Sequence, residues 1–119
     1  MHWTCATVSF PACTITYNDS HSSSSFAYSV DLLHHILAYL QDKHLRAFRR
    51  PDETPWRLIG SNIYTTPQQR KGFDCSIHLC LVADSHMRRT APTYTTAQAA
   101  SACPYLGLAL LWQQPLPWT

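Results

Sequence analysis

The stretch PQQRKGFDCSIHLC, residues 67–80, holds the densest group of chemically reactive side chains in this sequence. Its first half contains proline and glycine, which favour a loop, and its second half opens the helical pattern of residues 76–87. The reactive groups are an amide, an acid, an imidazole and two thiols, at Gln69, Asp74, His78, Cys75 and Cys80. The sequence therefore predicts a loop that leads into a helix, with Cys75 where the helix begins.

Three kinds of site could use these side chains. A metal site would use Cys75, His78 and Cys80, but C-x2-H-x-C is no standard zinc spacing, and residue 80 turns away from the helix face that the other two share. A redox pair would need the C-x-x-C geometry, which these two cysteines lack. A nucleophile fits better, because the dipole and the N–H groups at a helix start stabilise a thiolate. We therefore favour a nucleophilic Cys75 and keep a small metal-binding module as an alternative.

The composition limits the fold and the class of protein. The 119 residues suffice for one domain, and 45% hydrophobic residues with 12% aromatic residues indicate a folded chain. A net charge of +2 is too small to indicate a nucleic-acid partner, and no apolar run reaches the roughly 20 residues of a membrane span. Five cysteines are an odd number, which favours reduced thiols in the cytosol or nucleus over a secreted disulfide framework.

Hydrophobic periodicity predicts an α+β fold with an antiparallel sheet. Residues 3–10 and 13–19 alternate in the manner of strands, and a proline between them favours a hairpin. Apolar residues recur at helical spacing over 30–47, with Ser29 as the expected N-cap and Asp31 in the first turn. The other expected elements are a short strand around 61–64, the helix over 76–87 and a last helix from Tyr94 that Pro104 interrupts.

Three short motifs stand out when the chain is read as a whole. They are His2-Trp3, Tyr17-Asn18-Asp19-Ser20 and Pro67-x-Gln69-x-x-Gly72-x-Asp74-Cys75. Together they resemble the Ulp1-like cysteine proteases, which process and deconjugate SUMO and related ubiquitin-like modifiers. That family reads H-W, then Y-x-D-S, then P-x-Q-x-N-G-x-D-C-G, and the order is kept here. His2 and Asp19 stand seventeen positions apart, as is usual in the family, and the resemblance extends from residue 2 to about residue 90.

The resemblance implies a role for each of five residues. Cys75 would be the nucleophile, and His2 the general base that takes its proton and later returns it to the leaving amine. Asp19 would hold the imidazole in the right tautomer, and Gln69 would donate its side-chain amide to the oxyanion. Trp3 would line the narrow channel that admits a Gly-Gly tail, and the competing interpretation of Trp3 is an aromatic residue of the core.

The resemblance also implies a fold, an activity and a partner. The fold would be the catalytic portion of a papain-like cysteine protease, in which a short antiparallel sheet packs on helices. Residues 1–91 would form this portion and 92–119 a divergent C-terminal helix and tail, with the N-terminal part of the family domain absent. The activity would be cleavage of a peptide or isopeptide bond after the C-terminal glycine of a SUMO-type modifier, in processing or deconjugation. The partner would be that modifier or its conjugates, with no cofactor, metal, nucleic acid or membrane, in the nucleus or the cytoplasm.

Two departures from the family pattern lie beside the expected site. Lys71 stands where the family prefers Asn, and Ser76 where it prefers Gly directly after the nucleophile. Because Ser76 keeps a backbone N–H that can help to bind an oxyanion, we expect these changes to tune the activity. The alternative function is a truncated, catalytically silent fragment that at most binds a partner.

Overall fold

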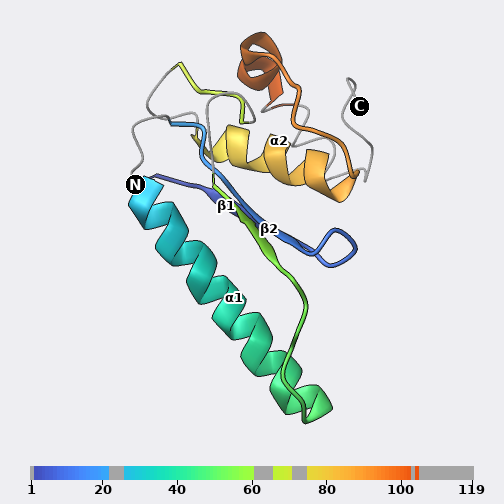
Figure 1. Cartoon of the computed structure of the whole chain (residues 1–119). Helices are drawn as coiled ribbons and strands as arrows, with labels where there is room; N and C mark the ends of the chain where they lie inside the picture. The colour runs from blue at the N-terminus through green and yellow to red at the C-terminus, as the bar shows by residue number, and fades with distance from the viewer. Residues whose placement is uncertain (1, 22–25, 61–65, 71–74, 103, 105–119) are drawn as a thin grey trace.

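The computed structural model has the α+β architecture expected from the sequence, and it describes residues 2–21, 26–60, 66–70, 75–102 and 104. Its elements are β1 (Cys5–Ser9), β2 (Thr14–Asn18), α1 (Phe26–Phe48), β3 (Arg57–Ile59) and α2 (Cys75–Met87). Residues 96–102 are also helical. Figure 1 shows α1 and α2 on either side of the sheet. Within the described ranges, no helix combines the length and apolar character needed to cross a membrane.

The sheet has the order β1-β2-β3 and combines two kinds of pairing. The first two strands form the expected hairpin, in which Cys5 lies opposite Asn18 and Ser9 opposite Thr14. The third strand joins β2 in parallel. An antiparallel sheet was expected, and this is confirmed for the hairpin, whereas β3 is parallel because α1 carries the chain back across the sheet before β3 begins.

The two faces of the sheet pack against different helices. Alternation along β2 directs Ile15 and Tyr17 to one face, where they form a core with Leu33 of α1, each at most 2% exposed. Cys5 lies on the opposite face and packs against a second core made by α2 and the last helical segment. The buried members of this second core are Leu81, Val82, Tyr94, Ala99 and Ala102. The start of β1 is therefore held directly against α2.

Two boundaries differ from the sequence expectations. The first helix begins at Phe26, so Ser29 is a buried residue inside α1 and not its N-cap, and no acidic residue occupies the first turn. The preceding residues 26–28 contain no proline or glycine, so nothing in them stops the helix from extending back. A strand was expected around 61–64, which lies outside the described residues, and the observed β3 occupies 57–59.

The other helices agree with the expected positions. The helix predicted over 76–87 is confirmed as α2, which begins one residue earlier, at Cys75. The helix expected from Tyr94 is present over 96–102, and most of the chain after it lies outside the described residues.

Candidate active site

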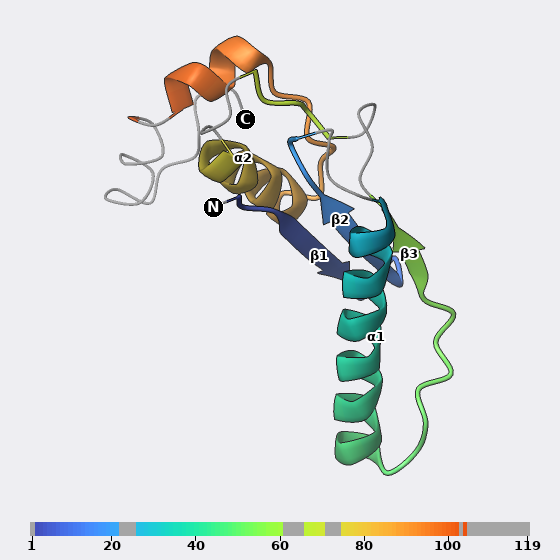
Figure 2. The ribbon, with the colours of Figure 1, turned by 90° about the vertical axis from the view of Figure 1, so that its left-hand side faces the viewer.

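Hairpin pairing and the start of α2 bring three distant side chains together. Because Cys5 pairs with Asn18, the segment before β1 runs beside the residue that follows β2, and so His2 meets Asp19. The backbone N–H of Trp3 donates to Sγ of Cys75 at 3.4 Å. Figure 2 shows the beginning of β1 next to the first turn of α2.

The imidazole of His2 lies between an acid and a thiol. Its Nε2 is 2.7 Å from Oδ1 of Asp19, whose side chain is only 1% exposed. The backbone N–H of His21 donates to the same Oδ1 at 2.8 Å, which fixes the carboxylate. The thiol of Cys75 also lies close enough to the His2 ring to raise its pKa. With Nε2 committed to Asp19, Nδ1 is the ring nitrogen left to exchange a proton with Cys75.

The surroundings favour a charged pair of thiolate and imidazolium. The hydrogen bond to Asp19 raises the pKa of His2 above 6.5, against the lowering effect of burial, and the nearby Cys75 raises it further. The N–H of Trp3 lowers the pKa of the Cys75 thiol, against the raising effect of burial, and His2 and the N–H of Ser76 lower it further. These opposite shifts bring the two pKa values closer together and so favour proton transfer from sulfur to the ring.

Gln69 reaches the same region through a loop that is bonded to the turn after β2. The backbone N–H of Gln69 donates to the carbonyl oxygen of Ser20 at 2.8 Å, and the Ser20 hydroxyl donates to Oε1 of Gln69 at 2.7 Å. Beside it, Nε2 of Gln68 donates to the carbonyl oxygens of Asp19 at 3.1 Å and Thr66 at 2.8 Å. The segment 66–69 is thus held against the residues that position His2.

Sequence reasoning missed two participants in this arrangement, Ser20 and Gln68. Both act through bonds to residues 49 positions away, a separation at which local periodicity carries no information. The one available signal was the position of Ser20, directly after the acid in the Y-x-D-S motif.

The family of the chain follows from a comparison with known families. The sequence matches the Ulp1 protease family, C-terminal catalytic domain, over residues 1–102. The chain belongs to the Ulp1 protease family. The resemblance seen in the three motifs is therefore confirmed.

Two solved structures of Ulp1 have a similar fold. The SUMO protease Ulp1 with its catalytic cysteine oxidized to a sulfenic acid is 22% identical, with a TM-score of 0.77 over 94% of this chain and 48% of that chain. The C-terminal Ulp1 protease domain in complex with Smt3, the yeast ortholog of SUMO, is 24% identical, with a TM-score of 0.68 over 82% of this chain and 41% of that one. The expected fold is confirmed, and the chain spans less than half the length of either structure. No curated protein matches the sequence.

Trp3 has no place in the core of this Ulp1-family member. Its side chain is 53% exposed, so the interpretation of Trp3 as a core aromatic residue is wrong. Its backbone, by contrast, contacts Cys75 directly. The side chain lies at the surface, and its role in lining a channel stays a prediction.

The residues considered for a metal site have other surroundings in this Ulp1-family fold. His78 is 2% exposed, and its Nδ1 lies 2.9 Å from the hydroxyl of Tyr94, while Cys80 is exposed. Within the described part of the chain, no three His, Cys, Asp or Glu residues lie close enough to hold a metal ion. Asp74 and Lys71, which the motif analysis singled out, lie outside the described residues.

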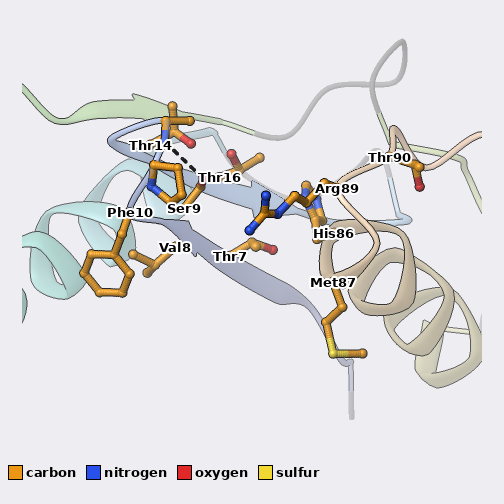
Figure 3. Close-up of a pocket in the computed structure, with 12 residues that line it drawn as sticks. Thr7, Val8, Ser9, Phe10, Thr14, Thr16, His86, Met87, Arg89 and Thr90 are labelled. Carbon is orange, nitrogen blue, oxygen red and sulfur yellow. Dashed lines mark hydrogen bonds between the residues drawn. The ribbon is translucent and has the colours of Figure 1, made fainter.

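A hollow of about 590 Å³ lies away from this site, at the far end of the hairpin (Figure 3). Hydroxyl side chains of the two strands and basic side chains from the end of α2 and just after it line it, among them Thr7, Ser9, Thr14, Thr16, His86 and Arg89. Neither Cys75 nor His2 contributes to it. The hollow is therefore separate from the candidate active site, which is identified by the contacts among His2, Asp19 and Cys75.

Proposed function

We propose that this chain is the catalytic portion of a cysteine protease that cleaves after the C-terminal glycine of a SUMO-type modifier. The observation that carries the proposal is the contact of His2 with both Asp19 and Cys75 at the start of α2. Thiol-dependent acyl transfer requires a nucleophile in contact with a base that is itself held by an orienting acid. The modifier is inferred from the similar Ulp1 domain, whose structure contains Smt3.

The reaction would begin from the thiolate–imidazolium pair. Sγ of Cys75 attacks the carbonyl carbon of the last glycine, which forms a C–S bond and an oxyanion. As the oxyanion collapses, the C–N bond breaks and the His2 imidazolium gives its proton to the leaving amine. Water, deprotonated by His2, then attacks the thioester carbonyl, and the C–S bond breaks to release the glycine carboxyl group and restore the pair of Cys75 thiolate and His2 imidazolium. Asp19 keeps Nε2 protonated, so that Nδ1 handles the proton in each step.

The amide of Gln69 would stabilise the oxyanion in both halves of the reaction. A single donor of this kind contributes about 2.7–4 kcal/mol to the lowering of the barrier. The bonds between its loop and the turn after β2 support this role, because they hold Gln69 close to the residue that orients the base. The backbone N–H of Ser76, next to the nucleophile, would add a second donor.

Three finer assignments belong to the same proposal. Trp3 would line the channel that admits the glycine tail, in keeping with its exposed side chain and with the contact of its backbone N–H with Cys75. Residues 1–91 would form the catalytic portion and 92–119 a divergent helix and tail, since every proposed catalytic residue lies in the first part. The protein would work in the nucleus or the cytoplasm, where its thiols stay reduced.

The alternative is a catalytically silent member of the family that binds a partner at most. It is favoured by one observation, that the chain covers only 41–48% of the similar Ulp1 structures. The two functions differ in whether Cys75 reacts with a bound modifier.

A modifier with an electrophile at its C-terminus tests the proposal. We expect a covalent adduct with the wild-type chain and with Cys80→Ala, which removes an exposed thiol of the same helix. We expect none with Cys75→Ala. Equal labelling of Cys75→Ala would mean that other thiols react, and no adduct from a folded wild-type chain with several modifiers would favour the silent alternative.

A further inference from the structure

The side-chain amide of Gln69 is held by a hydroxyl that the reaction scheme has not used. The Ser20 hydroxyl donates to Oε1 of Gln69 at 2.7 Å, an ordinary distance for a well-formed O–H···O hydrogen bond. Ser20 is only 5% exposed. Water has little access to this position, so the protein alone supplies the donor.

This bond decides how the amide is turned. A primary amide has an oxygen on one side and an NH2 group on the other, and a flip exchanges an acceptor for two donors. When the oxygen accepts from Ser20, the NH2 group of Gln69 faces away from Ser20. The bond also polarises the amide, which makes its N–H groups stronger donors.

The loop itself does not need the hydroxyl. The backbone N–H of Gln69 already bonds the carbonyl oxygen of Ser20, and Gln68 ties the same loop to Asp19 and Thr66. Loss of the hydroxyl would therefore leave the backbone of 66–69 in place. Its effect would be confined to the orientation of the Gln69 amide.

We propose that Ser20 is a positioning residue that presents the NH2 group of Gln69 to the developing oxyanion. The inference rests on the proposed function, because it assigns Ser20 a part in the oxyanion step. It predicts a specific kinetic pattern. An interaction made only in the transition state changes kcat and leaves KM unchanged, whereas a loss of uniform substrate binding raises KM.

The test compares Ser20→Ala, Ser20→Thr, Gln69→Glu and the double variant Ser20→Ala/Gln69→Glu in hydrolysis of a SUMO-type modifier with a C-terminal fluorogenic amide. Misplacement of a catalytic group by about 1 Å can cost roughly 100-fold, so we expect Ser20→Ala to lower kcat by about 10- to 100-fold with KM unchanged. Ser20→Thr keeps the hydroxyl and should restore most of the rate. Once Gln69→Glu has removed the NH2 group, adding Ser20→Ala should cost less than about two-fold.

Two controls separate positioning from folding. Ser85→Ala removes another partly buried hydroxyl, which bonds the carbonyl oxygen of Leu81 at 2.9 Å and lies away from Gln69, and it should leave kcat unchanged. Alkylation of Cys75 by iodoacetamide needs no oxyanion donor and should be equal in Ser20→Ala and the wild type. A slower alkylation, or additive losses in the double variant, would overturn the proposal. If Ser20→Thr does not fold, the double-variant comparison still decides.

A third measurement does not depend on turnover. In ¹⁵N-labelled protein, Ser20→Ala should change the side-chain amide resonances of Gln69, while most backbone resonances of 66–69 stay in place. An unchanged Gln69 side-chain signal would overturn the role of Ser20. If Ser20→Ala changes the Gln69 signal as expected but the wild-type chain hydrolyses no modifier, only the proposed function is contradicted.

Discussion

Asp19 acts on His2 through charge and through geometry, and Asp19→Asn separates the two. Oδ1 of Asp19 accepts from the imidazole Nε2 at 2.7 Å and from the backbone N–H of His21 at 2.8 Å. Both partners are donors, so an amide oxygen can take the place of Oδ1 in both bonds. We therefore expect Asp19→Asn to keep the ring orientation and to remove only the negative charge.

The size of the effect follows from this geometry. A hydrogen bond to a charged group contributes about 1.5–3 kcal/mol and a neutral one about 0.5–1.5 kcal/mol, a difference of about 1–1.5 kcal/mol. Since 1.4 kcal/mol is a factor of ten, and since the 38% exposure of His2 lets solvent screen the pair, we expect a loss of about 5- to 10-fold in kcat/KM. Asp19→Ala removes both bonds and leaves the base unoriented, so its loss should reach roughly 100-fold or more.

The assay is kcat/KM for a modifier with a C-terminal fluorogenic amide, measured from about pH 5 to about pH 10. The acid limb of the profile follows deprotonation of Cys75, and the alkaline limb follows loss of the imidazolium proton. Asp19 raises the pKa of His2, so its neutralisation lowers that pKa and moves the alkaline limb to lower pH. Alkylation of Cys75, followed by mass spectrometry of its peptide, gives the thiolate fraction without any modifier.

Two results would refute this reasoning. Equal losses for Asp19→Asn and Asp19→Ala would mean that the charge, and not the orientation of His2, carries the whole effect. An alkaline limb that stays in place in Asp19→Asn would mean that the carboxylate does not set the protonation of His2. Thermal unfolding of each variant serves as the control, because a buried acid can also affect stability.

Three further predictions concern stability, each measured by urea unfolding. Because folding raises the pKa of His2, the stability that His2 contributes is complete below pH 6.5 and is lost as the pH rises through the raised pKa. The loss of free energy of unfolding in His2→Ala should therefore shrink as the pH rises, and a loss that stays constant with pH would contradict this. Leu33→Ala should lower the free energy of unfolding by about 2–5 kcal/mol, because Leu33 is only 1% exposed. Leu45 is 47% exposed, so Leu45→Ala should lower it far less, and equal losses would argue against the core described. Tyr94→Phe should cost about 1–3 kcal/mol, because it removes the hydroxyl next to Nδ1 of the buried His78, and a neutral result would mean that this bond adds nothing.

The hairpin could be predicted from local alternation, and the family resemblance supplied the pairing of His2 with Asp19. Alternation along both strands predicts their pairing, and the register then carries residues seventeen positions apart to the same end of the sheet. The helix that presents Cys75 was equally accessible from its apolar spacing. The hairpin and this helix needed only local patterns, whereas the pairing of His2 with Asp19 needed motifs from three parts of the chain.

Other features depend on tertiary structure and gave no local signal. The third strand has three residues, and its parallel pairing depends on where α1 returns the chain. Ser29 and Asp31 have the composition of a helix start, but the helix continues through them to Phe26. The role inferred for Ser20 arises only when a loop 49 positions away is placed against it.

The thiol receives two of its supports from one short stretch of backbone. His2 supplies the imidazole and Trp3 the neighbouring N–H, so both reach Sγ of Cys75 only while the segment before β1 stays docked on α2. Local opening of a few residues at the end of an element requires far less free energy than global unfolding. Fraying of this stretch would thus raise the pKa of the thiol and withdraw the base in a single event.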